Sequence, residues 1–291
     1  MAAKRKIDAA TGVETTGHSW DGIEELNSPL PRWWLWTFYA TIVFAIGYVI
    51  AYPALPGLSG ATHGLLGWSS RGDIKDEMQL LDQSRAAMRT KISATPIQQV
   101  IADADMRQFA VSSGAALYKV NCVQCHGSGA QGSKGFPNLN DDSWLFGGTV
   151  EQIQQTIAHG VRSSDDAETR IPPDMPKFGA DQILTAEQIE QVTETVLQLS
   201  NQEHDKAKAD AGQQVFAEQC ASCHGDAGQG NQDMGAPQLN DAIWLRGGSR
   251  DEIRAQISSP KLGMMPAWNG RLGEAATKEL AVYVHSLGGG Q

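Results

Sequence analysis

One sequence pattern occurs twice in the C-terminal two thirds of the chain, and this repeat restricts the fold more than any other feature. The pattern contains all four cysteines of the 291-residue sequence. Its paired segments are Cys122-Val-Gln-Cys125-His126 with Cys220-Ala-Ser-Cys223-His224, Pro137–Asp141 with Pro237–Asp241, and Trp144–Gly148 with Trp244–Gly248. The spacing of the segments is nearly the same in both copies. A single small domain has therefore been duplicated.

The repeated unit reads as helical. Thr149-x-x-Gln152 and Ser249-x-x-Glu252 are capping boxes, the pattern that opens a helix. Each is followed by isoleucines at helical spacing, and each repeat ends in another amphipathic segment. No alternation of strands and helices is visible. We predict a first domain at 106–201 and a second at 205–291, joined by the polar stretch 201–210.

The Cys-x-x-Cys-His pattern is the attachment signature of c-type haem. Its two thiols form thioethers with one porphyrin, and the adjacent imidazole ligates the iron. Three other interpretations exist: a zinc site shared by the two Cys-x-x-Cys pairs, a thioredoxin-like redox pair, and disulfides. None of them explains a histidine after each pair. The sequence therefore predicts two covalently attached haems, at Cys122 and Cys125 and at Cys220 and Cys223, with His126 and His224 on the irons.

A sixth ligand for each iron has to come from elsewhere in the chain. Met175 and Met265 both precede proline at matching places in the two repeats, so they are the candidates. A thioether ligand favours ferrous iron and raises the reduction potential relative to histidine. The alternatives are Met264, adjacent to Met265, then Met234, which follows the second cysteine pair closely, and His159.

An apolar run near the N-terminus, Trp33–Tyr52, is long enough as a helix to cross a bilayer. Tryptophans cluster at one end and tyrosines near the other, as at membrane interfaces, and prolines follow. We expect a transmembrane helix at 33–56 rather than a buried helix or a cleaved signal peptide. The nearest basic residues, Lys4, Arg5, Lys6 and Arg32, all precede it, so the positive-inside rule places 1–32 in the cytoplasm. The repeats are then periplasmic.

The segment 57–105 connects the membrane helix to the first repeat. Within it, Asp73–Ile92 has apolar residues at helical spacing and predicts an amphipathic helix. That helix could pack on a partner subunit or on the chain's own first domain. The net charge of −10 argues against a nucleic-acid partner and favours basic protein partners.

These motifs together resemble the membrane-anchored dihaem subunit of cbb3-type cytochrome c oxidases, the CcoP/FixP type. The resemblance spans nearly the whole chain and implies a mainly α fold, with one N-terminal transmembrane helix and two tandem class I cytochrome c domains. It implies that the first haem has His126 and Met175 as axial ligands, and the second His224 and Met265. It also implies that the carbonyls of Pro137 and Pro237 accept hydrogen bonds from the two histidines. The first repeat departs from the second by a longer loop, 161–174, before its methionine.

The implied function is electron relay in the bacterial inner membrane. A donor cytochrome c would reduce one haem. A monohaem cytochrome subunit or the haem–copper catalytic subunit of the oxidase would receive the electron. The chain itself needs no catalytic residues for this role. Two alternatives remain from the sequence: a free-standing anchored dihaem cytochrome, and a dihaem peroxidase, which needs an open iron site.

Overall fold

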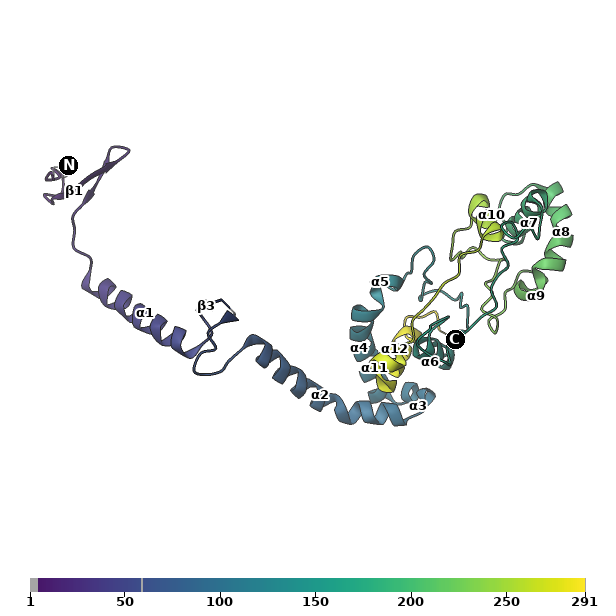
Figure 1. Cartoon of the computed structure of the whole chain (residues 1–291), viewed down its shortest axis with the longest axis horizontal. Helices are drawn as coiled ribbons and strands as arrows, with labels where there is room; N and C mark the ends of the chain where they lie inside the picture. The colour runs from purple at the N-terminus through teal and green to yellow at the C-terminus, as the bar shows by residue number, and fades with distance from the viewer. Residues whose placement is uncertain (1–4, 59, 291) are drawn as a thin grey trace. The chain divides into compact units, whose positions relative to one another are not determined.

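The computed structural model describes residues 5–58 and 60–290, and its secondary structure is mainly helical (Figure 1). Lys4, one of the four basic residues used for the orientation, lies outside these residues. The chain divides into two compact units, with the division after Gln83. The first unit contains β1 (Thr15–Trp20), β2 (Ile23–Leu26), α1 (Arg32–Ala51), β3 (Pro56–Gly57), β4 (Gly60–Ala61) and most of α2 (Ser70–Ala94).

The strands β1 and β2 form an antiparallel hairpin ahead of the membrane helix, with Trp20 opposite Ile23. Its two turn residues, Asp21 and Gly22, have φ values of 49° and 82°. Positive φ at both central positions is typical of a type I′ turn, which Asp-Gly favours. The Asp21-Gly22 pair is thus the sequence signal for this hairpin, which was not predicted.

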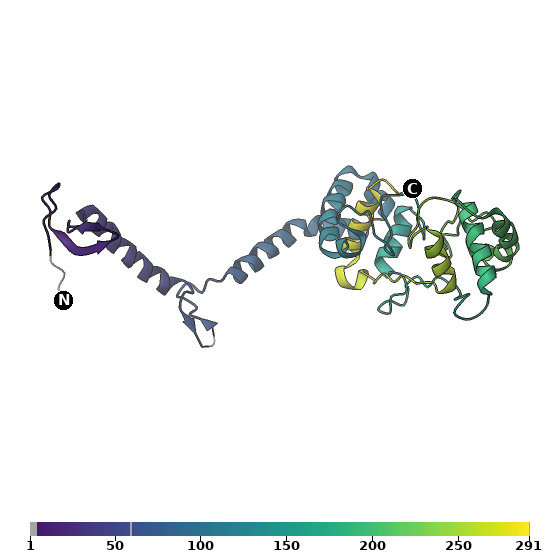
Figure 2. The same ribbon diagram turned by 90° about the horizontal axis from the view of Figure 1, so that it is seen from above.

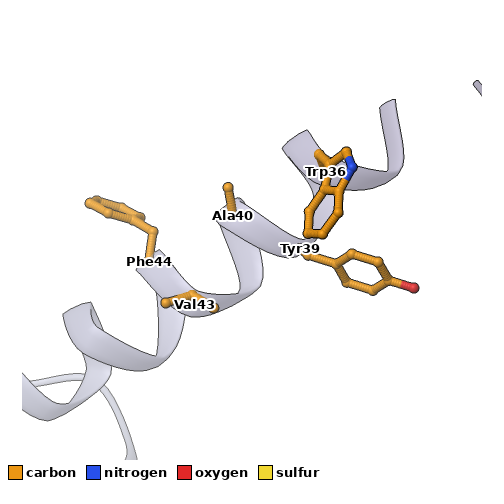
Figure 3. A pocket seen from close by; sticks show the side chains of 5 residues that line it. All are labelled: Trp36, Tyr39, Ala40, Val43 and Phe44. Carbon is orange, nitrogen blue, oxygen red and sulfur yellow. The ribbon is translucent and has the colours of Figure 1, made fainter. Parts of the chain in front are cut away.

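The helix α1 is apolar on all sides, and none of its side chains is buried. Figure 3 shows five of them, Trp36, Tyr39, Ala40, Val43 and Phe44, projecting outward from the helix. A helix that is hydrophobic all round requires a non-aqueous environment. The helix ends at Ala51 rather than at 56, because Pro53 disfavours a helical conformation at Tyr52, which is extended at φ −114° and ψ 159°.

The chain folds back after α1. The amides of Leu65 and Leu66 donate to the carbonyls of Ile50 and Ala51 at 2.9 and 3.1 Å. These bonds satisfy acceptors that a helix end otherwise leaves open.

The second unit contains the rest of the helices, in two lobes (Figures 1 and 2). The His126 lobe consists of α3 (Ile97–Ala102), α4 (Ala104–Asn121), α5 (Val123–His126), α6 (Val150–His159), α11 (Asn269–Leu272) and α12 (Glu274–His285). The His224 lobe consists of α7 (Ala186–Leu199), α8 (Lys206–Gln219), α9 (Ala221–His224) and α10 (Arg250–Ser258).

The two repeats exchange their last helices. In the His126 lobe, α12 from the second repeat packs on α4 and α6 of the first. In the His224 lobe, α7 from the first repeat packs on α8 and α10 of the second. The short connection 200–205 explains half of the exchange, because helices joined by few residues pack as an antiparallel hairpin. Neither predicted range, 106–201 or 205–291, therefore packs its last helix on its own first helix.

The end of α2 packs on the His126 lobe. Ile92 is fully buried in the core of this lobe and Met88 packs against it, whereas Ile74 and Met78 are exposed. The amphipathic helix predicted at Asp73–Ile92 thus contacts the chain's own first cysteine-containing lobe at its C-terminal end.

Candidate functional site

Each Cys-x-x-Cys-His segment forms a single helical turn at the end of a longer helix. In the His126 lobe, the amides of Cys125 and His126 both donate to the carbonyl of Cys122, at 3.1 and 2.9 Å. In the His224 lobe, Cys223 and His224 donate to Cys220 at the same distances. Positions i, i+3 and i+4 share one face of a helix. The turn therefore presents two thiols and one imidazole together.

A proline carbonyl fixes the tautomer of each imidazole. Nδ1 of His126 lies 2.9 Å from the carbonyl oxygen of Pro137, and Nδ1 of His224 lies 2.9 Å from that of Pro237. A carbonyl can only accept, so Nδ1 carries the proton and Nε2 keeps its lone pair. Burial lowers the pKa of both histidines, and the hydrogen bond to proline opposes this only in part. Both groups are neutral imidazoles at neutral pH, the form that ligates iron.

The first thiol of each pair is in apolar surroundings. Burial, followed by the neighbouring cysteine, raises the pKa of Cys122 and of Cys220 to about 11. None of these four cysteines, all of which the structure describes, is in a disulfide. Zinc needs several thiolates or imidazoles at one point, and no group of three His, Cys, Asp or Glu side chains converges within 5–58 and 60–290. The donor set fits thioether attachment of a porphyrin better than the zinc interpretation.

The candidate methionines are exchanged along with the helices. Met265 packs against the core of the His126 lobe, together with Cys122 and Val123. Met175 packs against the core of the His224 lobe, together with Cys220. Each methionine thus lies with the other repeat's cysteines, opposite to the pairing that the resemblance implied, Met175 with His126 and Met265 with His224. The reason is that each methionine precedes the helix that crosses into the other lobe.

A backbone ladder holds Met265 in the His126 lobe. The amide of Val161 donates to the carbonyl of Met265, and the amide of Met265 donates to the carbonyl of Val161, both at 2.9 Å. Gly160 makes this approach possible, because a Cβ at this position would meet the backbone of Met265 and Pro266. The longer loop at 161–174 thus supports the methionine of the other repeat.

The alternative sixth ligands are placed less favourably. The side chain of Met264 is 70% exposed, whereas that of Met265 is partly buried in the lobe. Both ring nitrogens of His159 face carboxylates, Nδ1 with Asp166 at 3.2 Å and Nε2 with Glu168 at 3.4 Å.

The two repeated tryptophans line the cores of the two lobes. Trp144 packs against the His126 core and Trp244 against the His224 core. A cavity of about 160 Å³ lies between 143–145 of the first repeat and 229–238 of the second. Pro237, the acceptor for His224, lines this cavity. The cavity is therefore lined by Trp144 of the first repeat and by the proline that accepts from His224 in the second.

Sequence reasoning missed several charged groups near these sites. Arg170 and Arg246 gave no motif signal. Buried Glu194 and Glu279 lie on helical stripes that resemble ordinary solvent-facing positions. Gly114 and Gly212 occupy equivalent positions in the two repeats. These repeated glycines were the sequence signal for the close helix crossings that bury acidic residues.

Two small helical lobes, each presenting a Cys-x-x-Cys-His turn and a partly buried methionine, define a c-type cytochrome with an N-terminal membrane helix. The comparisons with known proteins specify it further. The family model for the cbb3-type cytochrome c oxidase subunit III matches residues 109–194 and 207–284, and the N-terminal domain of cytochrome oxidase-cbb3, FixP, matches 12–59. The chain belongs to the subunit III family of cbb3-type cytochrome c oxidases.

Full-length relatives support this assignment. The chain is 53% identical to the cbb3-type cytochrome c oxidase subunit FixP of Sinorhizobium medicae over the whole of both chains. It is 52% identical to subunit CcoP of Cereibacter sphaeroides over 95% of each chain. It is 48% identical to subunit CcoP of Rhodobacter capsulatus over 96% of this chain and 97% of the relative.

These findings confirm the predicted family, the helical class with two cytochrome c segments, and the electron-transfer role in the oxidase. The cytochrome c segments imply covalently bound c-type haem. The single apolar helix α1 is consistent with the anchor of an oxidase subunit. The free-standing cytochrome and the peroxidase, both open from the sequence, are not favoured.

Proposed function

We propose that the chain carries two covalent haems and that each haem is enclosed by residues from both repeats. Cys122 and Cys125 attach the first, with His126 and Met265 as axial ligands. Cys220 and Cys223 attach the second, with His224 and Met175. The observation that carries this assignment is the exchange of α7 and α12, which delivers each methionine to the core that contains the other repeat's cysteines.

Each bound haem supplies a reversible one-electron carrier whose potential depends on its axial ligands and surroundings. The protein residues do the remaining work. Pro137 and Pro237 orient the imidazoles, the cysteines retain the group covalently, and the methionine loops exclude water from the sixth position. Because a thioether fills that position, the sites transfer electrons and do not bind substrate.

We propose that a donor cytochrome c reduces this chain, and that the monohaem cytochrome subunit or the haem–copper catalytic subunit accepts its electrons. Support comes from the relatives, which are subunits of cbb3-type oxidases, and from the net charge of −10. An acidic surface steers a basic donor, so the association rate should fall as ionic strength rises.

We propose that the N-terminus is cytoplasmic and that both lobes lie in the periplasm. Arg32 begins α1, Arg5 and Lys6 precede it, and the first basic residue after it is Arg71. Protease added to spheroplasts should remove the lobes and spare the N-terminal hairpin. Protection of the lobes would contradict this orientation.

The ligand assignment can be tested by substituting each methionine in turn in a chain that attaches only one haem. In the variant Cys220→Ala/Cys223→Ala only the first attachment site remains. In this background Met265→His should lower the potential and change the absorption of the ferric haem, whereas Met175→His should change neither. If Met175→His changes the first haem, the methionines are not exchanged.

The proposal requires that the mass of the purified chain exceed that of its amino acids by the mass of two haems. Acidified acetone should not extract these haems.

Extraction in mild detergent tests the partners. The haem–copper subunit should co-purify with the chain, and a chain that purifies alone without oxidase activity in its fraction would contradict the proposed assembly.

A further inference from the structure

Two guanidinium groups in the second unit lack an acidic partner, although both are partly buried. Within residues 5–58 and 60–290, neither Arg170 nor Arg246 has a carboxylate within 4.0 Å, whereas Arg162 and Arg250 do. Burial lowers the pKa of both Arg170 and Arg246. A desolvated cation is costly unless an anion compensates it. Their placement therefore requires an explanation.

Arg170 faces the same side as the candidate ligand Met265. The backbone of Val161 pairs with the backbone of Met265 on one side and with that of Arg170 on the other. Residues paired across neighbouring strands project to the same face, so all three side chains share the face that packs on the His126 lobe. Nη2 of Arg170 donates to Oε1 of Gln155 at 2.9 Å, whereas its Nε is buried and has no hydrogen-bond partner. The guanidinium lies over the ring of Phe146, 5.2 Å from the ring centroid.

Arg246 reaches the His126 lobe from the second repeat. Its Nη1 lies 3.2 Å from the Cβ position of Gly135, in the loop that follows the first Cys-x-x-Cys-His turn. Its Nη2 lies 3.6 Å from the Cβ position of Gly263, two residues before Met265. The amide of Gly135 also donates to the carbonyl of Leu245 at 2.7 Å. The guanidinium thus lies between the loop on the histidine side and the loop on the methionine side.

The two repeats differ at the position of Arg246. Phe146 occupies the position in Trp144–Gly148 that Arg246 occupies in Trp244–Gly248. A Cβ at Gly235 would meet the ring of Phe146, so the His224 lobe receives an aromatic ring where the His126 lobe receives a cation. The second repeat also lacks the longer loop that supplies Arg170.

We propose that Arg170 and Arg246 form a carboxylate-binding site that holds the propionates of the haem attached at Cys122 and Cys125, and that this site raises its reduction potential relative to the second haem. The inference rests on the proposed function, which supplies the two haems. The carboxylates compensate the buried guanidinium groups. The positive charges in turn disfavour the ferric state, which carries one more positive charge than the ferrous state.

The test uses the full-length chain with Arg170→Gln and Arg246→Gln, and the charge-preserving variants Arg170→Lys and Arg246→Lys. Arg254→Gln is the control, because Arg254 pairs with exposed Asp251 on the surface of α10. Potentials are measured by optical titration in two backgrounds, Cys220→Ala/Cys223→Ala and Cys122→Ala/Cys125→Ala. The two glutamine variants should lower the potential of the first haem and leave the second unchanged, with a smaller effect for lysine.

A second readout does not depend on the potentials. Redox infrared difference spectra of protein with ¹³C-labelled haem carboxylates should show bands that shift in each arginine variant, lysine included, and not in Arg254→Gln. Unchanged carboxylate bands in the lysine variants would overturn the proposal even if the glutamine variants failed to mature. A fall in potential confined to the second haem would also overturn it. Absence of haem from the unmodified chain would instead refute the proposed function.

Discussion

Gly114 of α4 lies directly against Glu279 of α12, so that a Cβ on Gly114 would meet the Glu279 carbonyl oxygen. Gly212 of α8 makes the equivalent approach to Gln191 of α7. Each glycine is in the first helix of one repeat and its contact is in the last helix of the other. These two close helix crossings thus join the two repeats.

Gly114→Ala should destabilise the His126 lobe, because the added methyl group meets backbone atoms that cannot rotate away. We expect a loss of about 1–3 kcal/mol in the free energy of unfolding, typical of overpacking. Chemical denaturation of the full chain measures it. Gly270→Ala is the control, since a Cβ at Gly270 has no neighbour within 4 Å. Equal stability of the two variants would contradict the close crossing.

Met265→Ala should open the sixth position of the haem attached by Cys122 and Cys125, because the methionine packs in that lobe. The ferrous variant should bind carbon monoxide at one haem. The measurement is the carbon monoxide difference spectrum in the Cys220→Ala/Cys223→Ala background. Met264→Ala is the matched control, because Met264 is 70% exposed. If Met264→Ala opens the site and Met265→Ala does not, the ligand assignment fails.

Glu194 links three helices of the His224 lobe and makes its stability depend on pH. The carboxylate accepts from Nε of Arg250 at 2.5 Å and from the amide of Asp205 at 2.7 Å. The Arg250 hydrogen bond, followed by that of Asp205, lowers the pKa of Glu194 from its ordinary value of 4.5. The carboxylate therefore stabilises the fold above pH 4.5, and this contribution is lost as pH falls through the lower pKa of the folded state.

Glu194→Gln should consequently cost roughly 1–2 kcal/mol at neutral pH, less than for a fully buried pair because Arg250 is half exposed. The difference from the unmodified chain should shrink below pH 4.5. Denaturation at several pH values tests both statements. Glu190→Gln is the control, since Glu190 and Lys208 form a solvent-exposed pair, which contributes little to stability. A pH-independent difference at Glu194 would contradict the explanation.

Lys278 attaches the end of α2 to α12. Its buried ammonium donates to the carbonyls of Ser93 at 2.6 Å and Thr95 at 3.0 Å, and lies 3.4 Å from that of Ile92. A cation at a helix C-terminus satisfies carbonyls that have no partner within the helix.

Lys278→Met keeps most of the side-chain volume and removes these bonds, so amides around 93–97 should exchange hydrogen faster while the His224 lobe is unaffected. Hydrogen exchange measured by mass spectrometry checks this. Lys75→Met, at an exposed position of α2, should leave the exchange unchanged. Unaltered protection at 93–97 in Lys278→Met would show that packing of Ile92 alone secures the junction.

The sequence was sufficient for the features that depend on local patterns. The Cys-x-x-Cys-His turns, the capping boxes at Thr149 and Ser249, and the apolar run of α1 can each be recognised within a few residues. The histidine–proline hydrogen bonds followed from the resemblance, and the geometry agrees with it. These features are local because hydrogen bonding and hydrophobic periodicity act over a few turns of chain.

The tertiary structure alone decided which helix completes which lobe. Both repeats have similar last helices, so hydrophobic patterns allow α12 to pack on α4 or α8 equally well. The short connection 200–205 holds α7 beside α8, which leaves α4 for α12, and the two methionines change lobes with their helices. Packing between distant segments also created the surroundings of Arg170, Arg246 and Lys278. Such residues carry no sequence signal, because burial and the loss of a solvent partner arise only once the helices have assembled.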